Sequence, residues 1–215
     1  MRLLNVNIGQ RKTQPKGNEL EVTGIYKLPA HGPTGLTRLG ILGDFIGDLA
    51  DHGGPDQAVY LYGEPDYEWW SKELGSPLGP GTFGENLTVS QLESARLSVG
   101  DRLEVGSAIL EVTAPRIPCS TLARRMGDPM FVKRYRHAER PGVYCRVVRE
   151  GTVEEGDDIK LLALSGEVVT VIDIFREHYA LEKNEATLRR FLAAPIAVRT
   201  RADVSKQLEK MLARS

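Results

Sequence analysis

The stretch LEVGSAILEVTAPRIPC, residues 103–119, indicates the fold class more directly than any other part of this chain. Apolar and polar residues alternate in two runs, residues 103–105 and 108–112, which are separated by Gly106 and Ser107. Alternation with a period of two is typical of half-buried β-strands, and a two-residue connection containing glycine is typical of a hairpin. The stretch therefore predicts a β-hairpin.

Short strands of the same kind are predicted on both sides of this hairpin, separated by glycine, proline and aspartate. They cover residues 1–7, 19–27, 58–62, 142–150 and 158–164. Many short strands at this spacing favour a barrel or a sandwich. We therefore expect a mainly β (α+β) domain over residues 1–164.

Three helices are predicted within this domain. The first covers residues 64–74, because Pro65 suits the first turn of a helix and Gly75 suits the position after its end. The second covers residues 119–126, and the third begins at Asp128, which acts as an N-cap. We expect these helices to lie at the periphery of the strands.

The pattern changes near residue 165, where short amphipathic helices replace the strands. Thr170 and Asn184 are the predicted N-caps of the first two helices, and Thr200 or Asp203 begins the third. The sequence therefore predicts a second, small three-helix C-terminal domain over residues 165–215.

Composition limits the classes of function. The 215 residues are enough for one full core and a small appendage. A formal net charge of −1 gives no basic footprint for nucleic acid, and no apolar run approaches the roughly 20 residues that span a membrane. The first residues lack the apolar stretch of a secretory signal, and two cysteines favour a reducing compartment. We expect a cytoplasmic protein with neither nucleic-acid nor membrane partners.

Motif content also argues against several cofactors. Cysteine-ligated iron–sulfur clusters normally take four cysteines, and the chain has two. The Cys-x-x-Cys-His pattern of c-type haem, the Gly-x-Gly-x-x-Gly fingerprint of dinucleotide sites and the spacing of a zinc finger are all missing from the sequence. If the protein is a redox enzyme, its electrons are expected to come from another protein.

Cys119 is the candidate functional thiol. Pro115 and Pro118 fix the backbone around it, and the guanidinium of Arg116 three residues earlier favours the thiolate. A thiolate is the form that ligates soft metals or attacks as a nucleophile. Cys145, by contrast, alternates with valines in a predicted strand and is expected to be a small buried hydrophobic residue.

Two glycine motifs and a basic cluster allow more than one interpretation. In residues 52–59 the glycines predict a tight turn, or backbone N–H groups that approach an anion beside a histidine. In residues 81–89, Glu85 and Asn86 are turn residues, or they offer a carboxylate and an amide to the donor and acceptor groups of a heterocycle. The arginines and lysine of residues 124–140 form a solvated face, or bind a phosphate or an acidic partner. A catalytic Cys–His dyad is a further alternative, although the sequence shows no residue that would orient the histidine.

The motifs taken together, in this order, resemble the MOSC domain family, named for the C-terminal domain of molybdenum cofactor sulfurase, in its YiiM-like bacterial branch. The resemblance rests on GILGD (40–44), HGGPDQAV (52–59), PGTFGENLT (80–88), PRIPC (115–119) and RPGVY (140–144). It covers residues 6–164, and the tail is similar to the small helical domain that often follows in this branch. The resemblance implies a MOSC-type β-barrel with peripheral helices.

The resemblance also implies the molybdenum cofactor (molybdopterin), with Cys119 as the catalytic residue and the metal ligand. The cofactor-binding candidates are Arg116, Asn86, Glu85, Gly84, His52 and Gly53. Some members of the branch carry an aromatic residue and a lysine after the cysteine, whereas this chain has Ser120 and Thr121. This difference leaves the substrate preference open.

The activity that the resemblance implies is the reduction of N-hydroxylated compounds of the hydroxylaminopurine or amidoxime type. The electrons would come from a separate donor protein of reductase, ferredoxin or flavodoxin type. A carrier that holds a persulfide on Cys119, or that stores the cofactor, is the alternative. A third interpretation is a metal-free binding module whose short tail helices serve association, for example in a homodimer.

Overall fold

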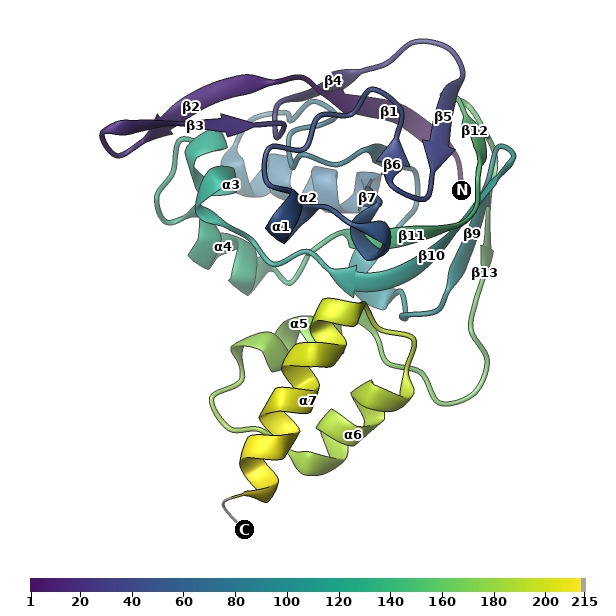
Figure 1. The fold of residues 1–215 in the computed structure, drawn as a ribbon. Helices are drawn as coiled ribbons and strands as arrows, with labels where there is room; N and C mark the ends of the chain where they lie inside the picture. The colour runs from purple at the N-terminus through teal and green to yellow at the C-terminus, as the bar shows by residue number, and fades with distance from the viewer. Residues whose placement is uncertain (214–215) are drawn as a thin grey trace.

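The structure, a computed structural model, describes residues 1–213 and has a β-rich part with three helices packed against one side of it (Figure 1). The strands of its largest sheet are β1 (Leu3–Gly9), β4 (Lys27–Pro29), β7 (Val59–Gly63), β8 (Leu87–Val89), β9 (Arg102–Val105), β10 (Ala108–Pro115), β11 (Val143–Arg149) and β13 (Ile159–Leu162). They pair in the order β13-β9-β10-β11-β7-β8-β1-β4. All neighbours in this order are antiparallel except β7 and β8, which run parallel.

The predicted hairpin is confirmed as β9 and β10. Ala108 lies opposite Val105, so Gly106 and Ser107 form the two-residue connection. Gly106 has φ +53°, and a Cβ at this position would lie 2.3 Å from the carbonyl oxygen of Thr152. Both the dihedral angle and the close approach require glycine here.

The mixed fold with a large β-sheet is confirmed, but the strand ladders do not close into the predicted barrel. Within residues 1–213, β13 and β4 are the edges of the eight-stranded sheet. The start of the chain approaches β13 through one isolated bridge, between Arg2 and Asp158, and through the bond from Ile159 N–H to the oxygen of Met1 (2.8 Å). The alternation of apolar and polar residues predicts strands but not which strands pair. The sequence therefore could not show whether the sheet closes into a barrel.

Residues 19–27, predicted as one strand, form β3 (Glu19–Thr23) and β4 with a bend between them. The bend packs tightly, since a Cβ on Gly24 would lie 1.7 Å from the carbonyl oxygen of Phe45. The strand β3 pairs with β2 (Lys12–Lys16) in a hairpin that projects from the molecule (Figure 1). A third sheet has the order β12-β5-β6, from strands β12 (Gly151–Val153), β5 (Thr34–Thr37) and β6 (Gly40–Ile41).

Four α-helices and two 3-10 turns accompany the strands. They are α1 (Leu49–His52), η1 (Pro55–Gln57), α2 (Glu64–Leu74), η2 (Ser94–Arg96), α3 (Ser120–Arg125) and α4 (Phe131–Ala138). The predicted bounds of α2 are confirmed, with Gly75 in the left-handed conformation after its end. The buried Trp70 of α2 donates to the hydroxyl of Tyr62 (2.9 Å), which fixes the helix against β7.

The tail consists of α5 (Val171–Tyr179), α6 (Glu185–Ala193) and α7 (Val198–Leu212). Thr170 and Asn184 accept backbone hydrogen bonds as the predicted caps. The prediction that α7 begins at Thr200 or Asp203 is wrong, because its first N–H, of Val198, donates to Oδ2 of Asp56 (2.7 Å). The sequence cannot show a cap supplied from 142 residues away. Residues 214 and 215 of the predicted domain lie outside the described residues.

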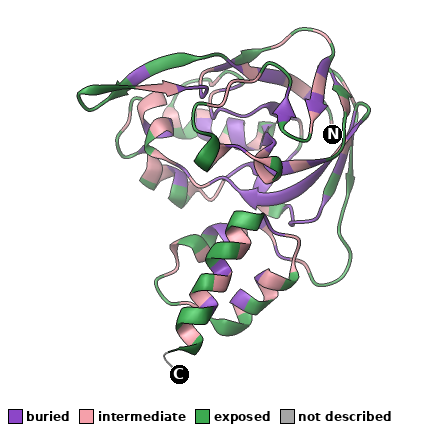
Figure 2. Cartoon of the chain, in the orientation of Figure 1, coloured by how far each residue is buried: buried purple, intermediate pink, exposed green. Residues whose placement is uncertain are grey.

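The tail and the sheet share one apolar core. Buried residues lie along the sheet and also on the tail helices (Figure 2). Leu188, Phe191 and Val204 of the tail belong to the same buried cluster as Leu110 and Val112 of β10. The three helices are therefore packed on the β-rich part. None of the helices within residues 1–213 combines the length and the apolar character that crossing a membrane would require.

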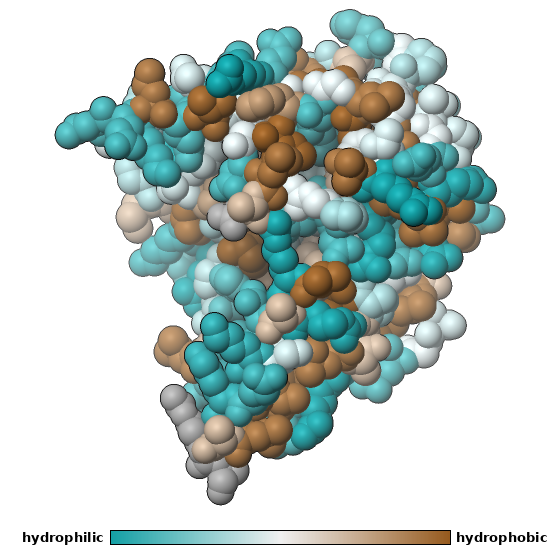
Figure 3. Space-filling model, viewed as in Figure 1, coloured by the Kyte–Doolittle hydropathy of each residue, from teal (hydrophilic) through white to brown (hydrophobic). Residues whose placement is uncertain are grey.

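Hydrophobic side chains also reach the surface around β6 and α1 (Figure 3). Leu39, Leu42 and Leu49 are all more than half exposed there. Leu42 and Leu49 flank residues 44–48, which form one wall of the cavity described next.

Candidate functional site

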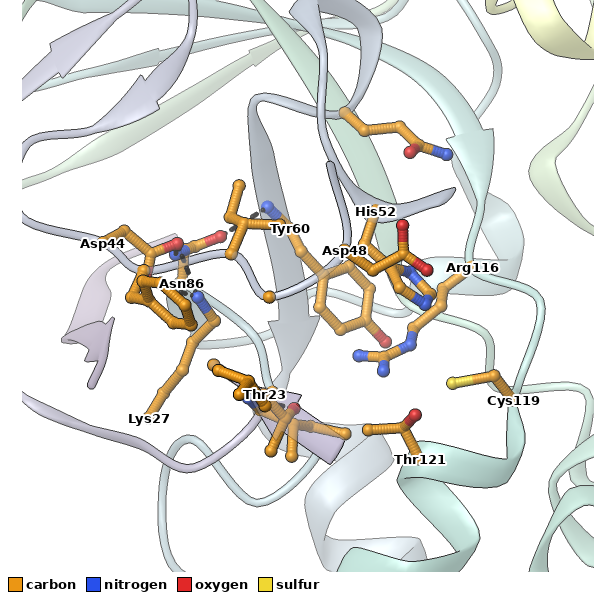
Figure 4. Close-up of a pocket in the computed structure, with 18 of the residues that line it drawn as sticks. Thr23, Lys27, Asp44, Asp48, His52, Tyr60, Asn86, Arg116, Cys119 and Thr121 are labelled. Atoms are coloured by element: carbon orange, nitrogen blue, oxygen red, sulfur yellow. Dashed lines mark hydrogen bonds and ion pairs between the residues drawn. The ribbon is translucent and has the colours of Figure 1, made fainter. Parts of the chain in front are cut away.

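The site is built where β10 ends and α3 begins. Residues 116–119 connect the two elements, and Cys119 is the N-cap residue of α3, with the extended angles φ −124° and ψ 170°. Its sulfur points into a cavity of about 100 Å³, beside Arg116 and Thr121 (Figure 4). At about 10–15 Å³ for each water molecule, the cavity has room for several waters or for part of a larger ligand.

The surroundings of Cys119 favour its thiolate. Burial disfavours the charge, but a hydrogen bond with His52, the positive charge of Arg116 and the backbone N–H of Leu122 together lower the pKa of Cys119 to about 6. By contrast, burial raises the pKa of the Cys145 thiol well above its ordinary value. Near neutral pH the two cysteines therefore differ in charge, and only Cys119 can act as a thiolate.

Arg116 is a buried cation next to this sulfur. Its Nη1 donates to the carbonyl oxygen of Phe83, and its guanidinium lies 5.0 Å from the centre of the Tyr60 ring. Burial disfavours its charge, but Tyr144, Tyr60 and the Cys119 thiolate raise the pKa of Arg116 above its ordinary value. Its Nε is buried without a hydrogen-bond partner. A buried donor of this kind is available to an acceptor on a ligand.

A second polar group of residues forms the far wall of the cavity. Nζ of Lys27 lies 2.6 Å from Oδ1 of Asp44, and both side chains are buried. Asn86 donates to Oδ2 of Asp44 (2.9 Å) and accepts from the N–H of Tyr60 (3.1 Å). Gly9 N–H also donates to Asp44 (2.6 Å). These bonds fix the wall, and they hold the ammonium of Lys27 facing the carboxylate.

His52 and Tyr144 complete the rim. His52 is the last residue of α1, and its Nδ1 lies 3.5 Å from the hydroxyl of Tyr144. The centroids of the Tyr144 and Tyr60 rings are 5.0 Å apart, and the guanidinium of Arg116 lies over the Tyr60 ring. The rim therefore carries groups that can donate or accept a proton next to the sulfur.

The structure brings five of the predicted site residues to this cavity, namely Cys119, Arg116, Asn86, Gly84 and His52. Glu85 lies outside the lining and is fully buried, where it accepts from the Tyr67 hydroxyl (2.7 Å) and from Gly81 N–H (2.6 Å). Gly53 is also outside the lining, and its carbonyl accepts from Arg199 (3.4 Å). The turn at this motif is made by Gly54, with φ +97°.

Sequence reasoning did not select several residues that line the cavity. Lys27, Tyr60 and Thr121 lie in or beside predicted elements with no motif of their own. Asp44 closes the GILGD motif, so its acidic side chain after a glycine was the one available signal. Their common location depends on how β4, β7 and β8 are arranged, which the alternation does not reveal.

The basic cluster of residues 124–140 makes structural contacts. Arg124 pairs with Glu21, Arg125 donates to the carbonyl oxygens of Thr82 (2.6 Å) and Gly81 (2.9 Å), and Arg140 pairs with Asp66 (2.6 Å). These arginines connect α3 and the segment after α4 to the rest of the β-rich part. The cations that line the cavity are instead Arg116, next to the sulfur, and Lys27, on the far wall.

The side chains around the cavity suit a metal that is already bound by an organic ligand. No group of three or more His, Cys, Asp or Glu side chains within residues 1–213 is arranged to hold a metal ion. A single ionised sulfur in a polar cavity, next to a buried cation with a free N–H, suits a soft metal carried by an anionic organic ligand.

Comparison with known proteins gives a consistent result. The family described as the MOSC domain matches residues 48–160. The chain is 34% identical to the uncharacterized protein YflK of Bacillus subtilis, over 98% of this chain and 96% of that protein. It is also 34% identical to a protein of Gibberella moniliformis named "Reductase", over 74% of this chain but only 29% of the fungal protein. The crystal structure of YiiM from Geobacillus stearothermophilus is similar, with a TM-score of 0.79 and 26% identity, and covers 96% of this chain and 98% of that one.

Proposed function

Because this chain belongs to the MOSC domain family, in its YiiM/YflK-like bacterial branch, we propose that it is a molybdenum-cofactor-dependent reductase of N-hydroxylated compounds. The observation that carries the proposal is the Cys119 sulfur, which faces a polar cavity and has a pKa lowered to about 6. The name of the fungal relative supports reductive chemistry.

Cys119 would hold the metal, since a protein thiolate suits molybdenum that is already bound by dithiolene sulfurs. The free Nε of Arg116 would donate to the cofactor, and Lys27 with Asn86 would orient it from the far wall. When bound, the cofactor supplies the two-electron redox chemistry. The protein positions it, and the buried charge of Arg116 stabilises the anionic ligand set.

The proposed reaction is R–NHOH + 2 e⁻ + 2 H⁺ → R–NH₂ + H₂O. The N–O bond breaks, nitrogen is reduced, and the oxygen leaves as water. The electrons come from a separate protein of flavin or iron–sulfur type, because the sequence carries no second redox motif. His52 and Tyr144 lie together at the rim and can relay a proton from solvent to the leaving oxygen.

Metal analysis of matched variants tests this proposal. The protein is expressed in a host that makes the molybdenum cofactor, and molybdenum and pterin are measured per chain. We expect about one molybdenum in the wild type and in Cys145→Ser, and a loss in Cys119→Ser. Reduction of benzamidoxime with reduced methyl viologen as electron donor should follow the metal content. Wild type without molybdenum, or Cys119→Ser with full metal and activity, would refute the proposal.

The second candidate function is sulfur transfer, which the lowered pKa of Cys119 also suits. It predicts that metal-free protein carries one additional sulfur atom on Cys119 as a persulfide. Intact-mass measurement before and after a thiol reductant, with Cys119→Ser as the control, distinguishes it from the reductase.

A further inference from the structure

The turn formed by residues 81–84, within the PGTFGENLT motif, reaches the cavity at Gly84. The N–H of Gly84 donates to the carbonyl oxygen of Gly81 (3.0 Å), which closes the turn. Glu85 follows directly and is fully buried, but it does not line the cavity. A carboxyl group is costly to bury, so its place behind the turn needs a physical reason.

The turn supplies the hydrogen bond that orients Arg116. Among the described residues, the carbonyl oxygen of Phe83 is the one hydrogen-bond acceptor of the Arg116 guanidinium, and Nε of Arg116 has no partner. The contact with the Tyr60 ring, 5.0 Å from its centre, sets a distance but leaves the guanidinium free to rotate over the ring. A hydrogen bond is directional, so the Phe83 carbonyl determines where the free Nε–H points.

Two side chains hold the turn through its N–H groups. Oε1 of Glu85 accepts from the N–H of Gly81 (2.6 Å). The hydroxyl of Tyr67 accepts from the N–H of Thr82 (3.0 Å) and donates to the same Glu85 oxygen (2.7 Å). Thr88 also donates to this oxygen (2.8 Å). The buried carboxyl group therefore fixes the turn both directly and through Tyr67.

One arginine holds the turn through its carbonyl groups. Nε of Arg125 donates to the oxygen of Thr82 (2.6 Å), and Nη2 of Arg125 donates to the oxygen of Gly81 (2.9 Å). Arg125 is the last residue of α3, the helix that has Cys119 as its N-cap. The helix, the turn and the Arg116 guanidinium thus form a closed ring of contacts that begins and ends beside the sulfur.

We propose that three residues, Glu85, Tyr67 and Arg125, are positioning residues for Arg116. They hold the turn, and the carbonyl oxygen of Phe83 then orients the guanidinium. None of the three lines the cavity. The inference rests on the proposed function for the identity of the group that Arg116 meets. It gives the glutamate of the motif a role different from the cofactor contact that the resemblance implies.

The side-chain NMR signal of Arg116 tests this proposal on the full-length protein as isolated. In protein with ¹⁵N-labelled arginine, the Nε–H signal is assigned by its loss in Arg116→Lys, and its exchange with solvent is measured. A buried and immobilised Nε–H should give a resolved signal with slow exchange in the wild type. Arg125→Gln and Tyr67→Phe should each shift the signal and speed its exchange by about tenfold.

Further variants separate positioning from a general loss of stability. Glu85→Gln keeps an oxygen that can accept from the turn and should retain the Arg116 signal, whereas Glu85→Leu should change it. Arg134→Gln on α4 is the matched control, because the ion pairs of Arg134 are with acidic side chains outside the turn. Urea denaturation shows which variants are folded. Where Glu85→Leu does not fold, Arg125→Gln and Tyr67→Phe decide.

Two results would overturn the proposal. One is a wild-type position and exchange rate of the Arg116 signal in folded Arg125→Gln and Tyr67→Phe. The other is an equal change in Arg134→Gln, since it would show that any loosening near α3 and α4 moves the guanidinium.

The outcomes also separate this inference from the proposed function. If the wild type never contains molybdenum, the reductase proposal fails, and the Arg116 signal still decides the positioning. In a protein that contains molybdenum, Arg125→Gln should weaken its retention during dialysis by about tenfold, and Arg134→Gln should not. If molybdenum and benzamidoxime reduction are present while the Arg116 signal is the same in Arg125→Gln, only the inference about the turn fails.

Discussion

At the scale of single residues, the two cysteines have opposite surroundings. Cys119 is half-buried beside His52 and Arg116, whereas Cys145 is fully buried in the sheet among apolar side chains. The sequence predicted the burial of Cys145, because that residue alternates with valines, and the structure confirms it. That Cys119 is the functional thiol stays a prediction, which rests on its neighbours Arg116 and Pro118 in the chain and on its place at the cavity.

This contrast predicts the pH dependence of thiol alkylation in metal-free protein. A thiolate reacts and a thiol does not, so the iodoacetamide rate at Cys119 should rise as the pH passes through about 6 and level off above about 7. The alkylation rate of a cysteine with an ordinary pKa would instead rise as the pH passes through about 8.5. Peptide mass mapping measures both sites, and Cys145 should stay unmodified throughout. A Cys119 profile centred above pH 8 would contradict the predicted environment.

The buried ion pair between Lys27 and Asp44 makes a prediction of its own. Lys27→Met leaves the carboxylate of Asp44 buried without its cation and should lower the free energy of unfolding by about 3 kcal/mol. The double variant Lys27→Met/Asp44→Asn should recover most of that loss, since no charge is left. Urea denaturation of the single and double variants measures the difference, and equal losses in both would argue against a coupled pair.

At the scale of elements, two glycines with similar dihedral angles serve different purposes. Gly142 immediately precedes β11 and has φ +62°, and a Cβ there would lie 2.5 Å from the hydroxyl oxygen of Tyr60 and 2.7 Å from Cδ2 of Tyr62. Gly75 ends α2 with φ +69°, and a Cβ there would meet nothing within 4 Å. The first position is constrained by packing and the second only by its backbone.

We therefore expect unequal costs for the same substitution. Gly75→Ala should destabilise the protein by about 1 kcal/mol, the cost of a left-handed alanine. Gly142→Ala should cost about 2–4 kcal/mol, because crowding of two buried tyrosines adds to the same backbone strain. Thermal or urea unfolding of the two variants compares them directly, and similar losses would show that the tyrosines move aside.

Elements that depend on neighbours in the chain were predictable, and those that depend on distant partners were not. The β9–β10 hairpin, α2 and the caps of α5 and α6 follow from local signals. The parallel pairing of β7 with β8 and the bend at Gly24 follow from contacts with segments far away in the chain. The same holds for the site, since Arg116 and Cys119 were found together but Lys27 and Asp44 were not.

At the scale of the whole molecule, the tail is attached by specific polar bonds as well as by apolar packing. Oδ2 of Asp56 accepts from Val198 N–H, and its Oδ1 lies 3.1 Å from Nε of Arg146. Arg146 also donates to the carbonyl oxygen of Pro195 (3.2 Å). The start of α7 is therefore fixed to the β-rich part.

Removing the Asp56 carboxylate should loosen this attachment. We expect Asp56→Ala to increase amide hydrogen exchange in the first turn of α7 and to lower the free energy of unfolding by about 1–2 kcal/mol. Asp56→Asn keeps an acceptor and should lose less. Thr170→Ala, which removes the local cap of α5, is the control and should raise exchange at α5 only. Unchanged exchange at residues 198–200 in Asp56→Ala would contradict the role of this bond.

Residues 49–57 serve both ends of the molecule, with His52 beside the reactive sulfur and Asp56 at the first turn of α7. A chimera that receives the helical tail of a relative would thus also need that relative's version of this loop, or its new helix would begin without an acceptor. The two segments are accordingly the practical unit to exchange together when the tail of one such protein is grafted onto another.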